Sequence, residues 1–332
     1  MLNSIKTKIY RYNVQDKQQK RIANLLALMP PMHSMPPKLA RPIFTVIDRI
    51  LGIPNTQLNT IKNVSIPTHD GNTTITTRVY YPNQTEAHPS TTHAMMYFHG
   101  GGCVIGSINS HDRLCRYLAQ NSNVVIISVN YRLAPEHKMP TPIIDAITAW
   151  NWLNDNKHAL GLQNHILGAG GDSAGAYLTA LLSLTDTQHE LPLKTKTPPA
   201  FQYLLYPMID LRGQTQSYQN ANKGMLLTNK LMDYFSKHYL QSVSQKASAI
   251  ASPALANDLH LLPKTYLLTV EFDPLKDDGI KFANTLKEKN IPITHEHFED
   301  CMHSFVTTYK VSERAKQACK QIAQQLKHLC ST

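Results

Sequence analysis

The sequence lacks a long apolar run. No hydrophobic stretch approaches the roughly 20 residues that a bilayer-spanning helix requires. The N-terminal residues are polar, without the apolar segment behind a basic start that marks a secretory signal. We therefore expect a soluble cytoplasmic protein with no stable membrane insertion.

Cysteine is scarce and irregularly spaced. The chain has five cysteines, an odd number, and no C-x-x-C pair. This usage argues against a disulfide framework and against a zinc site, and it favours reduced thiols. We predict no metal ion and no organic cofactor. The cysteines are Cys103, Cys115, Cys301, Cys319 and Cys330.

Charged residues are few as well, at 17% of the 332 residues. The formal net charge is +10, but Lys and Arg are scattered, and no basic stripe is interleaved with aromatic residues. We therefore expect no nucleic-acid partner and interpret the charge as that of a soluble basic surface. The hydrophobic share of 42% is enough for a sizeable globular core.

Strand and helix patterns alternate through most of the chain. Residues 61–82 hold two alternating strands around the turn signal Asp70-Gly71, which predicts an antiparallel pair at a sheet edge. Apolar strands separated by helical segments follow, which is typical of a mainly parallel sheet with helices on both faces. These strands are predicted at 94–98, 124–129, 166–169, 201–206, 265–271 and 293–298.

Two segments stand outside this alternation, residues 1–50 and 211–250. In the first, a helix is predicted over 1–29, the proline-rich stretch 30–42 interrupts it, and a short helix follows at 42–51. We expect the two segments to pack together as a lid over the carboxyl ends of the strands, where such sheets bind ligands. The core would then comprise residues 51–210 and 251–332.

The run Gly171-Asp172-Ser173-Ala174-Gly175 has the G-x-S-x-G form of a nucleophile elbow. The form is weak alone, since a turn serine that caps a helix has the same appearance. Here an apolar strand precedes it and a helix-forming run follows, the setting in which a strained turn exposes a serine hydroxyl. We therefore predict Ser173 as a nucleophile.

A second glycine-rich run, His99-Gly100-Gly101-Gly102, follows another predicted strand. Successive glycines leave backbone N–H groups able to point at an anion. In acyl transfer, each such donor stabilises the developing oxyanion by roughly 3–4 kcal/mol. A phosphate loop is the alternative, but no Gly-Lys-Ser/Thr follows. Beside an elbow, the run predicts an oxyanion hole.

A nucleophilic serine needs a base and the base needs an orienting acid, in the chain order Ser, acid, His. Asp273 is favoured as the acid because it ends the strand 265–271 directly before Pro274. His303 is favoured as the base because it lies in the loop after the strand 293–298. The other candidates are Glu271, Asp277, Asp278, His295 and His297.

Five motifs together resemble the hormone-sensitive lipase family of esterases, in particular its microbial members. The resemblance covers most of the chain from about residue 61, and it implies an α/β-hydrolase fold with a mostly parallel central sheet, flanking helices and a helical lid. The motifs are Tyr97-Phe98-His99-Gly100-Gly101-Gly102, Tyr131-Arg132-Leu133-Ala134-Pro135-Glu136-His137, Gly171-Asp172-Ser173-Ala174-Gly175, Asp273-Pro274-Leu275-Lys276-Asp277 and His303-Ser304-Phe305.

The resemblance implies Ser173 as nucleophile, Asp273 as acid and His303 as base. It also implies an oxyanion hole from the N–H groups of Gly101, Gly102 and Ala174, with His99 and Gly100 supporting the loop.

Some positions depart from the family pattern. Asp300 and Ser304 stand where the family often has glycine, so we expect a differently shaped histidine loop, with the charge of Asp300 near the base. Cys103 follows the glycines, where the family often has an aromatic or aliphatic residue, and we expect it to pack rather than to react. Arg132 and Glu136 are expected to form buried structural pairs.

The predicted function is that of a serine carboxylesterase, which cleaves short- to medium-chain carboxylic esters through an acyl-enzyme. An amidase or deacetylase would use the same triad, and the sequence leaves that choice open. A non-catalytic receptor of the same fold, like the plant gibberellin receptors that have lost the catalytic histidine, is disfavoured because His303 is present. The predicted partner is a small-molecule ester, and a homodimer is left open.

Overall fold

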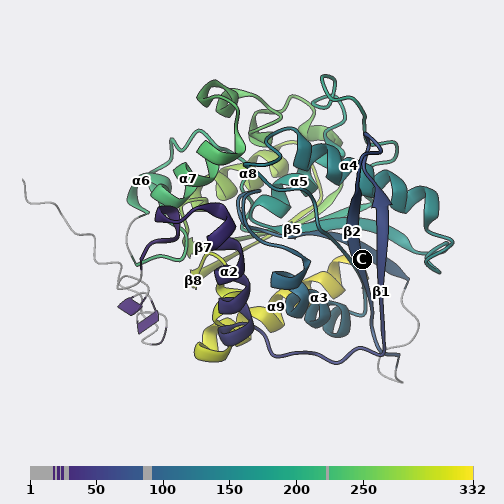
Figure 1. The fold of residues 1–332 in the computed structure, drawn as a ribbon, viewed down its shortest axis with the longest axis horizontal. Helices are drawn as coiled ribbons and strands as arrows, with labels where there is room; N and C mark the ends of the chain where they lie inside the picture. Colours follow the sequence, from purple (N-terminus) through teal and green to yellow (C-terminus); the bar gives the residue numbers. More distant parts are fainter. Residues whose placement is uncertain are drawn as a thin grey trace, which may run out of the picture.

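The computed structural model describes residues 18, 21–22, 24–25, 30–84, 92–221 and 224–331. Its strands are β1 (Thr60–Pro67), β2 (Thr74–Tyr81), β3 (His93–Phe98), β4 (Val125–Val129), β5 (Ile166–Asp172), β6 (Phe201–Leu205), β7 (Lys264–Phe272) and β8 (Ile293–Met302). They form one sheet in the order β1-β2-β4-β3-β5-β6-β7-β8 (Figure 1). β2 pairs antiparallel with both of its neighbours, and the other strands pair in parallel. The expected α/β-hydrolase sheet with an antiparallel edge is confirmed.

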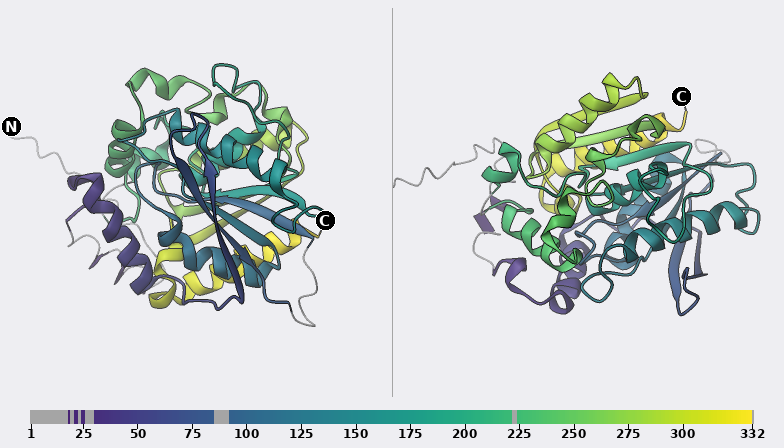
Figure 2. Two further views of the ribbon diagram at one scale, coloured as in Figure 1. Left: turned by 45° about the vertical axis from the view of Figure 1, so that its right-hand side comes forward. Right: turned by 90° about the horizontal axis from the view of Figure 1, so that it is seen from above.

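The α-helices are α2 (Pro37–Leu51), α3 (Ile108–Ser122), α4 (Thr141–Asn156), α5 (Ala174–Ser183), α6 (Gln216–Asn220), α7 (Asn229–Tyr239), α8 (Lys276–Glu288) and α9 (Glu313–Leu329). α4, α5 and α8 cover one face of the sheet, and α3 and α9 cover the other (Figures 1 and 2). Short 3-10 helices complete the described chain at η1 (Met32–Ser34), η2 (Val243–Ala247), η3 (Pro253–Leu255), η4 (Leu259–Leu261) and η5 (Phe305–Val311). None of the described helices combines the length and the apolar character that crossing a bilayer demands.

Both faces of the sheet are buried, and β3 shows how the sequence encodes this. Its side chains alternate between the two cores, with Ala94, Met96 and Phe98 in one and Met95 and Tyr97 in the other. A strand covered on both sides has no solvent face, so it appears as an unbroken apolar run. This is why the central strands could be located from the sequence.

The helix α2 begins earlier than predicted. A proline-rich interruption up to residue 42 was expected, but the helix starts at Pro37 and contains Pro42. Proline is tolerated in the first turn of a helix, where its missing N–H has no intrahelical partner. Pro42 withholds a donor from the carbonyl of Lys38, and both residues are exposed, so water can satisfy that carbonyl. The helix predicted over residues 1–29 lies largely outside the described residues.

Two buried pairs were predicted for the 131–137 stretch, one of Arg132 and one of Glu136, and only the first is buried. Arg132 forms a fork with Asp145, whose side chain is fully buried, with contacts of 2.7 and 3.0 Å. Glu136 pairs instead with Arg41 of α2 at 2.6 Å, and Glu136 is exposed. The prediction of a buried pair was therefore wrong for Glu136, because it follows the buried segment onto the surface.

The start of α5 crosses the end of β3 at very short range. A methyl carbon added to Gly175 would lie 1.8 Å from the carbonyl oxygen of Phe98, and one added to Gly171 would lie 2.4 Å from the same oxygen. That oxygen belongs to the backbone of a central strand, so it cannot move aside as a side chain can. The two glycines therefore allow the elbow to sit against β3.

We expect Gly175→Ala to lower the free energy of unfolding by about 3 kcal/mol or more, because the backbone at Phe98 must shift. Gly71→Ala is a control with no neighbouring atom within 4 Å of the added carbon. It should cost only about 1 kcal/mol, through its left-handed backbone. Urea unfolding followed by circular dichroism measures both variants, and equal losses would contradict the steric explanation.

Candidate active site

Ser173 occupies a strained turn between β5 and α5. Its φ of 54° and ψ of −115° lie in a region that non-glycine residues rarely adopt. The turn is held by the Ser173 N–H, which donates to the carbonyl of Leu205 at 2.9 Å, and by the Ser173 carbonyl, which accepts from the Met208 N–H. Only 6% of the residue is exposed. The predicted elbow geometry is thus present, and the serine is well covered.

The glycine-rich loop follows β3 and turns sharply. Gly101 and Gly102 have φ values of 111° and 61°, and a methyl carbon on Gly102 would collide with the ring of Phe235. Within the described part of the chain, the N–H groups of Gly101, Gly102 and Ala174 donate to no protein acceptor. These are the three groups that the resemblance implied as an oxyanion hole, and they are available to an anion.

Asp172 connects this loop to the elbow. Its Oδ1 accepts hydrogen bonds from the Gly100 N–H at 3.0 Å and the Tyr97 hydroxyl at 2.8 Å, and it lies 3.3 Å from His111 Nε2. Burial alone would raise the pKa of Asp172, but the charge of His111 and these hydrogen bonds outweigh it and lower the pKa. Burial alone would lower the pKa of His111, and the charge of Asp172 outweighs that and raises it. Each side chain therefore favours the charged form of the other at this buried contact.

His99 supports the loop from inside. Its Nδ1 lies 2.8 Å from the carbonyl of Gly100, and its ring stacks on Tyr131 with centroids 4.3 Å apart. The Tyr131 hydroxyl in turn donates to the His99 carbonyl at 2.7 Å. Burial lowers the pKa of His99 to about 3, so the ring is neutral at physiological pH and Nδ1 acts as the donor. His99 therefore shapes the loop and does not act as a base.

The structure brings Asp273 and His303 together. Each directly follows a strand, β7 for Asp273 and β8 for His303, and these strands are neighbours in the sheet. His303 Nδ1 lies 2.7 Å from Asp273 Oδ2, and both side chains are buried. The other oxygen of Asp273 accepts from the Leu275 N–H at 2.8 Å. The Leu275 N–H therefore fixes one oxygen of the carboxylate while the other oxygen orients the imidazole.

Ser173 stands at the end of β5, in the same row of strand ends. Its hydroxyl makes no hydrogen bond to His303 within the described residues. Contacts of this kind are commonly long until a substrate is bound. The Tyr206 ring packs against the imidazole with centroids 4.5 Å apart, and its backbone has a φ of 36°.

The other candidate acids and histidines bond elsewhere. Glu271 contacts His297 and Lys276, and His295 bonds to a threonine of β7. Asp277 accepts from the Ser217 N–H, as a brace between α8 and α6. Asp278 is the next residue of α8, and burial raises its pKa to about 7. None of them contacts His303 in the described chain, whereas Asp273 does.

The departures from the family pattern have clear structural consequences. The Asp300 carboxylate accepts a hydrogen bond from Arg314 Nε at 2.7 Å, and no ion pair joins it to His303 among the described residues. The Asp300 carboxylate is thus paired with Arg314, and it does not supply the charge that was expected beside the base. Ser304 adopts a left-handed backbone with φ of 57°, the conformation that glycine favours. The thiol of Cys103 is fully buried, which raises its pKa and makes it unreactive.

Three residues of this site carry too little signal in the sequence to assign a role: Asp172, His111 and Tyr206. Asp172 lies inside the elbow motif, so its position beside Ser173 was the available signal. His111 is one of several residues along α3, and only the packing of that helix against the sheet selects it. Tyr206 follows β6 without any motif chemistry of its own.

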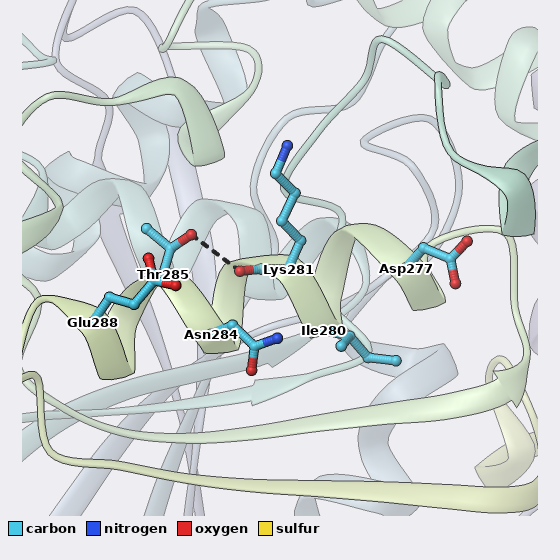
Figure 3. Close-up of a pocket in the computed structure, with 6 residues that line it drawn as sticks. All are labelled: Asp277, Ile280, Lys281, Asn284, Thr285 and Glu288. Carbon is cyan, nitrogen blue, oxygen red and sulfur yellow. Dashed lines mark hydrogen bonds between the residues drawn. The ribbon is translucent and has the colours of Figure 1, made fainter.

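Two surface hollows lie away from these residues. One, of about 570 Å³, lies between α2, the β1–β2 turn and the loop after β4. Figure 3 shows the other, which is lined by side chains of α8 alone, from Asp277 to Glu288. Neither is lined by Ser173, Asp273 or His303. Among the described residues, no cluster of three or more His, Cys, Asp or Glu side chains is arranged to hold a metal ion.

Comparison with known proteins identifies the family. Residues 95–307 match the model of a family described by its alpha/beta hydrolase fold. An ethyl acetate hydrolase from Pseudomonas putida is 31% identical over 297 residues, which cover 89% of this chain and 91% of that protein. An arylesterase from Saccharolobus solfataricus is 33% identical over 66% of this chain and 70% of its own length.

Solved structures of similar proteins point to the same family. An esterase from Pyrobaculum calidifontis is 32% identical with a TM-score of 0.81, and the match covers 94% of this chain and 99% of that one. An ester hydrolase from the metagenome of Lake Arreo is 29% identical with a TM-score of 0.85, over 95% and 99% of the two chains. The sheet and the elbow define the α/β-hydrolase class. Within it, the chain belongs to the hormone-sensitive lipase family of esterases.

Asp48 of α2 is a further buried carboxyl group near His111. It interacts with His111, Arg113, Lys310 and Arg49, all of which favour its ionised form. Burial outweighs them and raises its pKa to about 6, and its Oδ2 has no hydrogen-bond partner. Since the pKa in the folded state lies above the ordinary value of 3.8, ionisation of Asp48 costs stability as the pH rises from that value through about 6.

We therefore expect Asp48→Asn to raise the free energy of unfolding at pH 8 by about 2 kcal/mol, and to change it little near pH 4. Urea unfolding at the two pH values measures this difference. Asp155→Asn is the control, because Asp155 is exposed and pairs with Lys196 on the surface. A loss of stability at pH 8 in Asp48→Asn would show that the carboxylate is needed in its charged form.

Proposed function

We propose that this carboxylic ester hydrolase is a serine carboxylesterase with Ser173 as nucleophile, His303 as base and Asp273 as the orienting acid. The observation that carries the assignment is the buried 2.7 Å contact between His303 Nδ1 and Asp273 Oδ2 at adjoining strand ends. The strained backbone of Ser173 in the same row of strand ends supports it. The substrates we propose are carboxylic esters with short to medium acyl chains. A relative that hydrolyses ethyl acetate supports a short acyl group.

The proposed reaction begins when His303 Nε2 takes the proton of the Ser173 hydroxyl and the oxygen attacks the ester carbon. The carbonyl oxygen becomes an oxyanion, which accepts from the free N–H groups of the glycine-rich loop and of Ala174. As the intermediate collapses, His303 returns the proton to the departing alcohol and leaves an acyl-enzyme. Water, deprotonated by His303, then releases the acid and restores Ser173.

Asp273 acts through His303 in this scheme. By accepting from Nδ1–H, it places the free lone pair on Nε2, and its charge stabilises the imidazolium that forms. The Leu275 N–H holds the second carboxylate oxygen and so keeps the carboxylate in place.

Segments 1–50 and 211–250 are proposed as the lid, and residues 51–210 and 251–332 as the core. Tyr234 of α7 donates to the Met35 carbonyl at 2.8 Å, so the two segments meet. Arg41 of α2 donates to the Val104 carbonyl at 2.9 Å, and the ring of Phe235 lies against Gly102. Segment 211–250 therefore contacts the glycine-rich loop and segment 1–50 contacts the residues just after it, which supports a role in selecting esters. A homodimer and a cytoplasmic location stay predictions from the sequence.

The first test replaces the nucleophile. Ser173→Ala should lose labelling by a fluorophosphonate probe and reduce the hydrolysis of p-nitrophenyl butyrate by about a millionfold, because the acyl-enzyme can no longer form. Ser183→Ala is a matched control, because Ser183 is also buried and lies at the far end of the same helix. Unimpaired turnover in Ser173→Ala would refute the assignment. Turnover of p-nitrophenyl esters but not of matched anilides separates an esterase from an amidase.

The second test addresses the acid. Asp273→Asn should lower kcat by about a thousandfold or more, since the amide can stabilise the wrong tautomer of His303. Binding of a substrate analogue should change little, because Asp273 is proposed to act through His303 and not to touch the substrate. Asp277→Asn is the control, as Asp277 bonds to α6 instead. A similar loss of kcat in both variants would indicate a structural role for Asp273.

A further inference from the structure

The outer face of α2 carries a stripe of exposed apolar side chains. Its members recur at intervals of four, three and four residues, which places them along one side of a helix. They are Leu39, Ile43, Val46 and Ile50, exposed by 58%, 37%, 50% and 61%. We call these four residues the α2 stripe.

The stripe is unusual because the opposite side of the helix is already packed. Pro37, Ala40 and Asp48 are buried against the molecule, and the Phe44 ring lies near that of His111. A helix in contact with its protein on one side normally shows polar residues on the other. An apolar row exposed to solvent marks a contact surface. Figure 2 shows α2 at the margin of the molecule.

The charges beside the α2 stripe are positive. Lys38 and Arg49 are three helical turns apart, so both lie on one flank of the stripe, and both are exposed. At the C-terminal end of α2, Arg113 donates to the Arg49 carbonyl, and Lys310 donates to the carbonyls of Arg49 and Ile50.

The nearby acids are already engaged. Asp48 points inward and is buried, Glu136 pairs with Arg41, and Glu313 pairs with Lys316. The exposed carboxylates of Glu136 and Glu313 are thus each paired with another basic side chain, and the flank and the end of the α2 stripe keep a net positive charge from Lys38, Arg49, Arg113 and Lys310.

We propose that the α2 stripe is a peripheral docking surface for an anionic phospholipid bilayer. Apolar side chains flanked by Lys and Arg are the pattern of helices that lie in a membrane interface. Anionic lipids complement the cationic rim, and the apolar row enters between the headgroups. A second copy of the chain fits less well, because a two-fold contact through this face would bring the same positive charges together.

The position of α2 would bring a docked bilayer close to the candidate active site. Arg41 ties the inner side of the helix to the Val104 carbonyl, next to the glycine-rich loop. A bilayer on the outer side would therefore lie across one helix from the candidate active site. The proposal does not depend on the proposed function, since the binding that it predicts involves no reaction.

The test is sedimentation of the full chain with sucrose-loaded vesicles of phosphatidylcholine, with or without an equal share of phosphatidylglycerol. We expect binding to the anionic vesicles only, weakening as salt is added. Ile43→Ser/Ile50→Ser should reduce the partition coefficient by about tenfold. Lys38→Gln/Arg49→Gln should reduce it by a similar factor of about ten, with less remaining salt dependence.

The matched control is Ile166→Ser/Val243→Ser, which removes two exposed apolar side chains far from the stripe, 49% and 80% exposed. It should bind like the unmodified chain. Thermal unfolding followed by circular dichroism shows that each variant is folded. No binding to anionic vesicles at low salt would overturn the proposal, as would equal losses in the stripe and control variants. A dimer in light scattering that Ile43→Ser/Ile50→Ser converts to a monomer would assign the stripe to a second copy instead.

Discussion

The carboxylate of Asp172 joins three parts of the chain at one buried point. It accepts from the Tyr97 hydroxyl of β3 and from the Gly100 N–H of the glycine-rich loop, and it pairs with His111 of α3. A buried carboxylate is costly unless it is both hydrogen-bonded and paired with a charge, and here both conditions are met. Because Asp172 directly precedes Ser173, these contacts fix the position of the elbow relative to the glycine-rich loop. The proposed oxyanion hole depends on this relative position, since its N–H donors come from both the loop and the elbow.

The other groups of the proposed mechanism are placed by the sheet itself. Asp273 and His303 follow neighbouring parallel strands, whose carboxyl ends meet at one edge. The helix α2 is bound next to the glycine-rich loop through Arg41, and its two sides face different surroundings. The inner side contributes the buried carboxyl group of Asp48, whose pKa is raised by burial. The outer side presents the α2 stripe, so the proposed lipid contact and the proposed chemistry share one helix.

Most of the fold could be predicted, and the exceptions have physical reasons. Central strands are buried on both faces and stand out as apolar runs, while Asp70-Gly71 marks the one tight hairpin at the edge. The start of α2 was missed because local rules place prolines outside helices. Packing of its inner side and water on its outer side allow Pro37 and Pro42 within it. Glu136 was placed in a buried pair together with Arg132, yet Pro135, Glu136 and His137 are all exposed, because membership of a motif does not determine depth.

Ser173, Asp273 and His303 could be singled out because each stands at a strand end, in a chain order that leaves few alternatives. The sequence by itself determined the sheet, the family and which reactive side chains end the strands, since strand ends and motifs are local. Only the tertiary structure decided that Asp172 is charged, that Asp48 resists ionisation and that, among the described residues, nothing packs on one side of α2. Burial and the distance between charges arise from segments remote in the chain, and they exist only once those segments have packed together.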